Sequence, residues 1–462
     1  MKIKGALIRS ALIAALGGLL FGFDTAVISG AEGALRELYA DTYLSFSSVF
    51  GNSGFWHGFT VASALIGTII GSMIFAKPAD NYGRRKILFV LGELYFISAI
   101  GSALAWDWNS FVFFRFVGGL AVGGSSVIAP MYTAEISPAK FRGRMVALTQ
   151  FNIVFGMLLA FLSNYLISTM DLGALSWRWM FGVEAIPALV FILLLFLTPR
   201  SPRWLVSKNL LVEARGVIEK LGADSDNLDD EISAIQHSLD SEKGAKKEPL
   251  FQSKYFKPIM LAVAIAVFNQ LSGINALLYY TPRIFEMAGF EKGSALLSSV
   301  GIGIVNLIFT MAALLIIDHF GRKKLMIVGS VGYIISLAAT AWTFYKYGTE
   351  FDETGSIVVL VSLLVFISSH AFGQGAVIWV FISEIFPNKV RARGQSLGSF
   401  THWFMAASIS WMFPVVAEIS GGHVFTFFAI CMVGQLIWVV AFMPETKNIS
   451  LEDMQKKLGI DE

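Results

Sequence analysis

The segment Asp80-Asn-Tyr-Gly-Arg-Arg-Lys86 returns later in the chain as Asp318-His-Phe-Gly-Arg-Lys-Lys324, at an offset of 238 residues. A second motif, Glu135-Ile-Ser-Pro-Ala-Lys-Phe-Arg142, returns as Glu384-Ile-Phe-Pro-Asn-Lys-Val-Arg391, at an offset of 249. A third pair is weaker and joins Pro199-Arg-Ser-Pro-Arg203 to Pro444-Glu-Thr-Lys447. Motifs that recur in one order at nearly one offset indicate a chain of two halves built from one template.

The sequence between these motifs is strongly apolar. Hydrophobic residues make up 55% of the 462 residues and charged residues 15%, whereas a typical soluble domain has about a quarter charged residues. A hydrocarbon core about 30 Å thick requires about 20 apolar residues per helix. Runs of this kind occupy residues 7–30, 55–77, 86–105, 109–134, 145–169, 179–198, 258–285, 295–317, 325–345, 355–384, 395–416 and 424–443. We therefore expect an all-α membrane protein with 12 transmembrane helices.

Lys and Arg gather in alternate loops, and this bias predicts the orientation of the chain. One side of the membrane would hold the N-terminus, the repeated motifs, the long central loop and the C-terminal tail, all of which are rich in these residues. The opposite loops contain only Arg36, Arg178, Arg283, Lys292 and Lys346. Because positively charged loops stay in the cytoplasm, both termini are expected to be cytoplasmic, in a cell inner membrane.

The repeat also predicts the domain organisation. We expect an N-terminal six-helix bundle at 1–198, a cytoplasmic linker at 199–256, a C-terminal six-helix bundle at 257–443 and a cytoplasmic tail at 444–462. Two stretches of the linker, Leu210–Leu221 and Leu228–Leu239, have apolar residues at helical spacing. They are interpreted as short amphipathic helices beneath the bundle, the alternative being a loose linker.

Acidic and basic residues accompany each other in the repeated motifs. Charge-assisted Arg–carboxylate bonds are strong and directional, and between moving helices they would stabilise whichever state brings them together. We expect a cytoplasmic gate that consists of Asp80, Arg84, Arg85, Glu135, Arg142, Asp318, Arg322, Glu384 and Arg391. The alternative is simple anchoring of helix ends on the positively charged side, but anchoring does not require the carboxylates.

Taken together, the motifs resemble the sugar porter family of the major facilitator superfamily, and in particular its bacterial D-xylose:proton symporter type. The resemblance runs nearly end to end. The matching segments are Gly18–Val27, Arg115 with the nearby glycines, Pro130–Glu135, Arg178–Phe181, Ser201–Leu205, Asn269–Asn275, Tyr279-Tyr280, Trp379, Ser383–Pro387 and Pro444–Lys447. The resemblance implies the major facilitator fold, in which two six-helix halves alternately expose a central site.

A sugar site needs neutral amide and hydroxyl partners and an aromatic platform, because sugars present hydroxyl groups and apolar C–H faces. Gln270 and Asn275 lie five residues apart, which a regular helix would align poorly, but a break at Ser272-Gly273 would turn both inward. Including what the resemblance implies, the expected substrate-binding residues are Phe21, Gln150, Asn269, Gln270, Asn275, Tyr279, Asn306, Gly375, Trp379, His402 and Trp403. The alternative for a single intramembrane amide is helix-to-helix hydrogen bonding.

Departures from the family pattern limit the prediction of the sugar. Asn269, Met157 and His402 stand at positions where the xylose type has Gln, and Ala376 replaces a usual Pro. A pocket with changed amides could hold a different pentose or hexose. Arg200 replaces the Glu of the family's Pro-Glu-Ser-Pro-Arg motif, which puts one cytoplasmic contact in doubt.

Ionisable residues inside apolar runs are costly and are usually functional. Asp24 lies deep in the first run and Arg115 in the fourth. The resemblance implies that Asp24 takes up the proton and that Arg115 modulates it, whereas facilitative members carry a neutral residue at the position of Asp24. Glu184 is a secondary candidate for the relay. The alternative is a static buried ion pair that orients helices.

We therefore expect a transporter, not an enzyme, that imports a monosaccharide by proton symport through alternating access. The alternatives are a facilitative sugar uniporter, a polyol transporter or a transporter-like nutrient receptor; a drug antiporter would lack the Gln270–Asn275 cluster. The partners are expected to be the sugar, a proton and the lipid bilayer, with the chain a monomer. No cofactor, metal or nucleic acid is expected, since the net charge is +2 and the one cysteine is Cys431.

Overall fold

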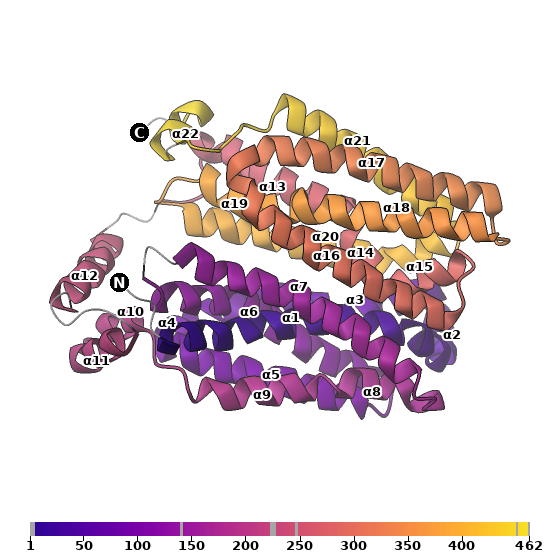
Figure 1. The fold of residues 1–462 in the computed structure, drawn as a ribbon, viewed down its shortest axis with the longest axis horizontal. Coiled ribbons are helices and arrows are strands. Elements are labelled where there is room, and N and C mark those ends of the chain that lie inside the picture. The colour runs from indigo at the N-terminus through magenta and orange to yellow at the C-terminus, as the bar shows by residue number, and fades with distance from the viewer. Residues whose placement is uncertain (1–4, 139–141, 222–227, 245–247, 450, 461–462) are drawn as a thin grey trace. The chain divides into compact units, whose positions relative to one another are not determined.

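The structure is a computed structural model that describes residues 5–138, 142–221, 228–244, 248–449 and 451–460. Within these residues the chain is almost entirely helical (Figure 1). Among them, 12 stretches are long and apolar enough to cross a membrane. They are Gly5–Leu38, Ser53–Ile74, Arg84–Ala103, Trp108–Ile136, Met145–Ser168, Gly173–Leu195, Ser253–Tyr279, Lys292–Phe320, Arg322–Tyr347, Glu353–Ile385, Arg391–Ala417 and Gly421–Ala441. The stretches correspond one to one with the predicted runs.

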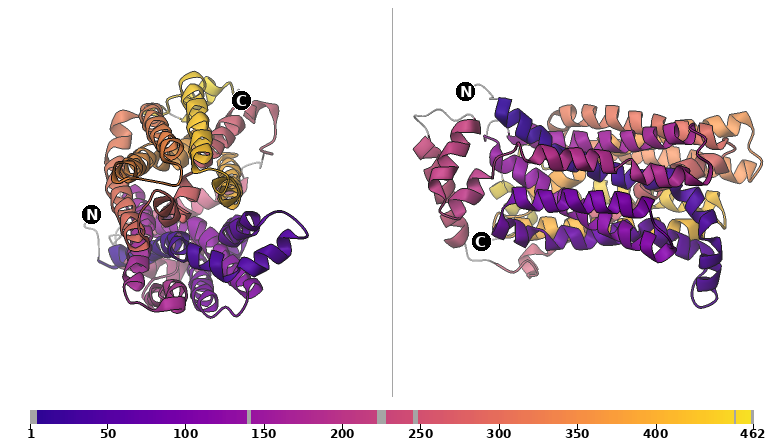
Figure 2. Two further views of the ribbon diagram at one scale, coloured as in Figure 1. Left: turned by 90° about the vertical axis from the view of Figure 1, so that its right-hand side faces the viewer. Right: turned by 90° about the horizontal axis from the view of Figure 1, so that it is seen from below.

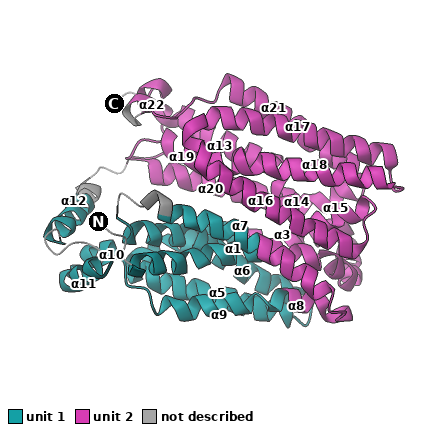
Figure 3. Cartoon of the chain, viewed as in Figure 1, with its two compact units in different colours: residues 1–24, 67–157, 181–247 teal, residues 25–66, 158–180, 248–462 magenta. Residues whose placement is uncertain are grey.

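The chain forms two compact units that do not follow the two sequence halves (Figure 3). The first unit contains residues 1–24, 67–157 and 181–247, and the second contains residues 25–66, 158–180 and 248–462. The first helix, which is 34 residues long, therefore contributes to both units. The predicted division near residue 198 rests on the repeat in the sequence and stays a prediction.

The first unit includes the helices that carry Asp24 and Arg115. Its elements are the first part of α1 (Gly5–Leu38), the end of α3 (Ser53–Ile74), α4 (Ala76–Tyr82), α5 (Arg84–Ala103), α6 (Trp108–Ile136), the first part of α7 (Arg142–Ser168), α9 (Ala185–Leu195), α10 (Pro202–Ser207), α11 (Leu211–Leu221) and α12 (Leu228–Gly244). Small residues permit close helix packing in such bundles. A Cβ atom on Gly22 of α1 would lie 1.8 Å from the carbonyl oxygen of Ile153, and one on Gly156 of α7 would lie 2.1 Å from that of Leu19. The two glycines thus bring the α1 and α7 backbones into contact.

The second unit holds the remaining helices, and the long ones among them run alongside one another in the views of Figure 2. Its elements are the later parts of α1 and α7, most of α3, α2 (Ala40–Ser47), most of α8 (Ser176–Gly182), α13 (Phe256–Leu271), α14 (Ile274–Tyr279), α15 (Thr281–Met287), α16 (Lys292–Phe320), α17 (Arg322–Tyr347), α18 (Glu353–Phe372), α19 (Gln374–Ile385), α20 (Arg391–Ala417), α21 (Gly421–Ala441) and α22 (Leu451–Leu458). Within this unit α17 packs against α18 and α21, and α13 packs against α20.

Two spans of the second unit are interrupted at glycines. Gly273 has a φ of 85° and separates α13 from α14, and Gly373 separates α18 from α19. A left-handed backbone at Gly273 strains any residue that has a Cβ atom. The break that the sequence predicts at Ser272-Gly273 is confirmed, whereas the break at Gly373 was not expected.

The central linker forms the two expected helices. α11 and α12 lie side by side beyond α10 (Figure 1), and their apolar faces form one small core. That core contains Leu205, Val206, Ala214, Ile218, Leu228 and Ile232. The C-terminal tail also forms a helix, α22, which the sequence did not predict; its Met454 and Leu458 pack into a core that includes Ile382 and Ile385 of α19.

Candidate functional site

Asp24 and Arg115 form a buried ion pair in the first unit. Arg115 Nη1 donates to Asp24 Oδ1 at 2.6 Å, and Arg115 Nη2 donates to the Asp24 carbonyl oxygen at 3.3 Å. Asp24 is 1% exposed and Arg115 is 2% exposed. Gly118 leaves room for the carboxylate, since a Cβ atom there would lie 3.2 Å from Asp24 Oδ1. A charge pair at such depth is costly to bury, so its retention calls for a role in addition to packing.

Glu184 joins this pair from the break between α8 and α9. Its side chain is buried and lies close enough to interact electrostatically with both Asp24 and Arg115. Within the described residues, Glu184 Oε1 accepts no hydrogen bond. The guanidinium of Arg115 also lies over the ring of Phe181, at 5.2 Å from its centre. The structure thus brings all three residues predicted for proton coupling into one buried cluster.

A cluster of amides surrounds the helix break in the second unit. Asn275 Nδ2 donates to Gln270 Oε1 at 2.9 Å, and Gln270 Nε2 donates to Asn269 Oδ1 at 2.9 Å. Gln270 Nε2 also lies 3.4 Å from the ring nitrogens of His402. The break at Gly273 places Asn275 beside Gln270, which a continuous helix would not do. The result is a neutral donor and acceptor surface suited to hydroxyl groups.

An aromatic group adjoins the amides through His402. The ring of Trp379 lies 5.0 Å from that of His402, and the ring of Trp403 lies 4.9 Å from it, centre to centre. Trp379 keeps 40% of its surface exposed, whereas Trp403 is buried. Trp379 is therefore the most exposed ring of this group.

The other predicted substrate residues occupy separate places. Asn306 lies in α16, where Thr310 Oγ1 donates to its Oδ1 at 3.4 Å, and Tyr279 is buried at the end of α14. Gly375 lies in the first turn of α19. Phe21 and Gln150 belong to the first unit, on α1 and α7. The amide cluster itself is assembled within the second unit alone.

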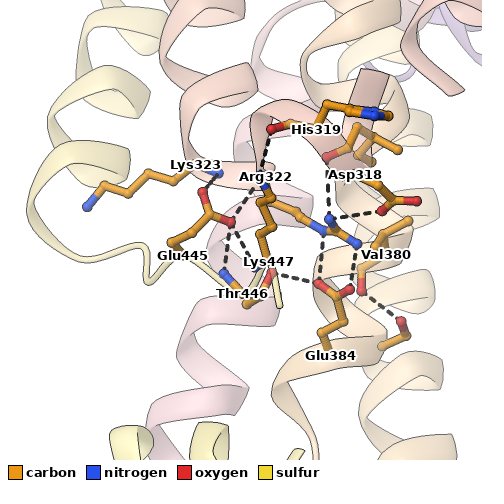
Figure 4. A network of polar contacts seen from close by, with 11 residues as sticks. Asp318, His319, Arg322, Lys323, Val380, Glu384, Glu445, Thr446 and Lys447 are labelled. Carbon is orange, nitrogen blue, oxygen red and sulfur yellow. Dashed lines mark hydrogen bonds and ion pairs between the residues drawn. The ribbon is translucent and has the colours of Figure 1, made fainter. Parts of the chain in front are cut away.

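Three of the predicted gate residues of the second unit, Asp318, Arg322 and Glu384, form a connected network (Figure 4). Arg322 holds Glu384 with two bonds, from Nη2 at 2.8 Å and from Nε at 3.2 Å, and it pairs with Asp318 at 3.2 Å. Thr446 Oγ1 donates to Glu384 at 2.6 Å. Glu445 accepts from the backbone N–H of Arg322 at 2.9 Å. The Pro444–Lys447 motif of the C-terminal tail is thereby hydrogen-bonded to the first residue of α17.

Backbone donors determine the charge state of Glu445, which lies outside the membrane-spanning helices. Partial burial acts to raise the pKa of its carboxyl, but the backbone N–H groups of Lys447, Arg322, Lys323 and Thr446 outweigh it and lower the pKa. A carboxylate at the N-terminus of a helix is also favoured by the helix dipole. Glu445 is therefore an anionic cap on α17.

The first unit repeats this network with one difference. Arg84 Nε donates to Glu135 at 2.9 Å, and Arg84 pairs with Asp80 at 2.9 Å. Ser201 Oγ donates to the second oxygen of Glu135 at 2.5 Å. Arg200 stands at the place that Glu445 holds in the second unit, and it pairs with Glu213 of α11 at 3.3 Å.

The remaining gate residues donate to backbone carbonyl oxygens or have side chains outside the described part of the chain. Arg85 donates to the carbonyl oxygens of Leu195 and Phe196, both at 3.2 Å. Arg391 Nε donates to the carbonyl oxygen of Phe386 at 3.3 Å. The side chain of Arg142 lies outside the part of the chain that the structure describes, so its place in the expected gate stays a prediction.

A second buried charge cluster was missed by sequence reasoning. Glu32 of α1 contacts His57 Nε2 of α3 at 2.7 Å and Arg283 Nη1 of α15 at 3.2 Å, and all three side chains are buried in the second unit. All three lie within or beside predicted membrane spans, and this position was the signal that could have identified them. Within the described residues no group of His, Cys, Asp and Glu is suited to a metal ion.

Comparison with known proteins agrees with these features. The family described as "Sugar (and other) transporter" matches residues 10–458. The chain is 36% identical to the D-xylose-proton symporter of Escherichia coli K12 over 474 residues, covering 96% of this chain and 94% of the relative. It is 34% identical to the arabinose-proton symporter of Bacillus subtilis, covering 98% and 95%.

A solved structure is similar over nearly the whole length. It is the partially occluded inward-open conformation of the xylose transporter XylE from Escherichia coli, with a TM-score of 0.85, 35% identity, and coverage of 97% of this chain and 100% of that one. The likeness confirms the major facilitator fold and the resemblance drawn from the motifs, and the protein is a multi-pass membrane transporter rather than an enzyme. The chain belongs to the sugar transporter family.

Proposed function

We propose that the protein is a secondary active transporter that imports a monosaccharide, a pentose or a hexose, together with a proton. The observation that carries the proposal is the buried Asp24–Arg115 pair inside a sugar transporter fold. A facilitative sugar carrier has no need of a carboxylate and a guanidinium at that depth, where both are costly. Relatives named as proton symporters for xylose and arabinose support the same reading.

The sugar binds at the amide cluster in this proposal. Gln270, Asn275 and Asn269 supply donors and acceptors to the hydroxyl groups, and Trp379 supplies a flat face for the C–H side of the ring. Asn306, Gly375, Tyr279, His402 and Trp403 of the second unit belong to the same proposal. Phe21 and Gln150 of the first unit are included because the family resemblance implies them. His402 and Asn269 reshape the amide pattern of the xylose type, so the preferred sugar need not be xylose.

The proton is carried by Asp24. When Arg115 is paired with the Asp24 carboxylate, the guanidinium favours the charged form. When a conformational change separates them, the buried carboxyl favours its neutral form and takes up a proton. Glu184, which interacts with both groups, provides a second acceptor along the route. Each transport cycle would make and break the pair once.

The two loop networks act as gates in this mechanism. Each ties two helix ends and a following segment together, in the first unit through Glu135 and in the second through Glu384. They stabilise the conformation in which these helix ends lie close together. Binding of the sugar and the proton must offset this stabilisation before the substrate site opens on the side of the membrane where the networks lie.

We place these networks on the cytoplasmic side of the cell inner membrane, with both termini there, because the loops that contain them are rich in Lys and Arg. The proposal treats the monomer in its bilayer as the working unit.

Uptake into proteoliposomes tests the function. Labelled xylose, arabinose, glucose, galactose and fructose would each be offered with and without an inward proton gradient. Accumulation above the outside concentration that a protonophore abolishes supports symport. Uptake that only equilibrates, whether or not a gradient is present, would instead identify a facilitative uniporter. No uptake of any of these sugars would lead to polyols and then to a receptor role.

A further inference from the structure

The tenth membrane span is interrupted beside residues of the proposed sugar site. α18 ends at Phe372 and α19 begins at Gln374, and Gly373 between them has a φ of −89° and a ψ of −102°. α19 carries Gly375 and Trp379, which both belong to the proposed sugar site. The direction that α19 takes after the break therefore determines where these two residues lie.

The local sequence permits this break but does not impose it. A proline at position 376 would prevent a continuous helix, because its ring would clash with the carbonyl group of residue 372, four positions earlier. This chain has Ala376 there, and alanine is the best helix former. Gly373 and Gly375 lower the helix propensity without excluding a helix. Contacts from other helices must therefore hold the break.

One hydroxyl group contacts both sides of the break. Tyr333 of α17 is completely buried. Its oxygen lies 2.6 Å from Nδ1 of His370, in the last turn of α18, and 3.4 Å from Oε1 of Gln374, the first residue of α19. The backbone of α17 also approaches the break, since a Cβ atom on Gly329 would lie 3.1 Å from the Cα atom of Gly373. Tyr333 thus joins the end of α18 to the start of α19.

The hydrogen bonds continue from Gln374 to a third helix and then return to α17. Gln374 Nε2 donates to Oε1 of Gln435 in α21. Gln435 Nε2 donates to Ser330 Oγ at 2.7 Å, and Ser330 Oγ donates to the carbonyl oxygen of Met326 at 2.7 Å. The side chains of Gln374, Gln435 and Ser330 are all buried. The first residue of α19 is thereby held by α21 as well as by α17.

The order of donors along this network is fixed from its end. The carbonyl oxygen of Met326 can only accept, which makes Ser330 its donor. Followed back along the network, this order makes Tyr333 the donor to Gln374, and the Tyr333 oxygen then accepts from the Nδ1–H group of His370. A buried polar network in which every donor meets an acceptor makes the segments that it joins more rigid.

The network reaches the proposed sugar site through two residues. The ring of His370 packs against Gly375, where a Cβ atom would lie 3.2 Å from His370 Nε2. Trp379 lies in the second turn of α19, and its ring is 5.0 Å from that of His402. If α18 continued into α19 as one helix, Trp379 would be carried to a different position relative to His402.

We propose that Tyr333 is a positioning residue for sugar binding. By holding His370 and Gln374 together, it keeps the tenth span broken at Gly373, as a proline at position 376 would do. Polar groups from two neighbouring helices thus replace a local steric constraint. The inference rests on the proposed function, since it gives Tyr333 a role in the binding of the transported sugar.

The first test measures the break itself and requires no sugar. Hydrogen–deuterium exchange is followed in peptides that cover residues 370–379 of the purified full-length protein. Tyr333→Phe should increase the exchange rate of these amides about tenfold, because it leaves a buried donor and a buried acceptor unpaired. Tyr345→Phe, which removes an exposed hydroxyl group from the same helix, should leave exchange unchanged. Exchange at the wild-type rate in Tyr333→Phe would overturn the proposal.

The second test measures sugar uptake in proteoliposomes. Tyr333→Phe should raise the KM for the transported sugar about tenfold and change the maximal rate less than about twofold, because it weakens binding and leaves the proton acceptor and the gates intact. Adding Ala376→Pro should return both the KM and the exchange rate to within about threefold of wild type, because the ring enforces the break and the third residue of a helix needs no backbone N–H.

Two results would reduce Tyr333 to a packing role and overturn the proposal. One is a raised KM that Ala376→Pro does not restore, and the other is faster exchange with an unchanged KM. A wild-type protein that transports no sugar would refute the proposed function instead, while the exchange measurement would still decide whether Tyr333 holds the break.

Discussion

Asn275 Nδ2 donates a 2.9 Å hydrogen bond to Gln270 Oε1 across the break in the seventh membrane span. The two residues are five positions apart, and they meet because Gly273 turns the backbone between them with a φ of 85°. The proposed sugar-binding surface thus depends on a backbone conformation that other residues adopt only with strain. Site and helix break form one structural feature.

Gly273→Ala is expected to destabilise this region. The left-handed backbone costs an alanine about 1–2 kcal/mol, and the new Cβ atom would lie 2.5 Å from the ring of Phe428. We expect a lower melting temperature and a loss of sugar affinity, measured on the purified protein. Gly301→Ala is the matched control, because nothing lies within 4 Å of its Cβ position in α16. Equal behaviour of the two variants would show that the break is not strained.

Gln270→Ala and Asn275→Ala should each weaken sugar binding by roughly 10- to 100-fold, because each removes a hydrogen-bonding group from a buried site. Tryptophan fluorescence titration with the transported sugar would measure the change. Gln395→Ala, which removes an exposed amide from the helix that carries His402, should leave the affinity unchanged. Unaltered affinity in the first two variants would move the sugar site away from the break.

Glu32→Gln should lower stability substantially, because it leaves Arg283 buried without the carboxylate that it contacts. Removal of one partner of a buried pair typically costs about 3–5 kcal/mol. The double variant Glu32→Gln with Arg283→Gln should recover part of the loss in melting temperature, since no unpaired charge is then buried. Glu37→Gln, on the same helix but exposed, serves as the control. A double variant that melts below both single variants would contradict this account.

Glu445 should contribute stability that depends on pH. Its pKa is lower in the folded protein than in the unfolded chain, so its contribution is complete above the unfolded pKa, roughly pH 4. The contribution is lost as the pH falls through the lower, folded pKa. Melting temperatures of wild type and Glu445→Gln should therefore differ by a constant amount near neutral pH and converge in acid. The exposed Glu350→Gln should differ little from wild type at any pH, and a difference for Glu445→Gln that grows in acid would reverse the sign.

Much of the fold could be predicted because the membrane imposes simple demands. Each span needs about 20 apolar residues, so hydropathy alone located the 12 stretches. It did not locate their ends. The first helix continues to Leu38, beyond the predicted end at residue 30, because packing in protein allows a helix to pass polar residues such as Glu32.

The contacts between distant segments could not be read from the chain. The sequence places Arg84 and Glu135 in one expected gate, but nothing in the spacing indicates that these two residues pair or that Glu445 caps α17, since both contacts depend on which loops come together. Glu32, His57 and Arg283 come from three separate spans and share no motif. By contrast, the helix break at Gly273 was predictable, because the amides on either side are useful only if the helix is interrupted.

The most direct test of proton coupling compares wild type and Asp24→Asn in proteoliposomes, with two assays on the same preparation. The first is gradient-driven accumulation of the transported sugar, and the second is counterflow exchange without a gradient. The account predicts that Asp24→Asn loses accumulation but keeps exchange, because the sugar site remains while the proton acceptor is gone. Accumulation that survives in Asp24→Asn at the wild-type level would contradict it, and Asp24 would then be a structural partner of Arg115.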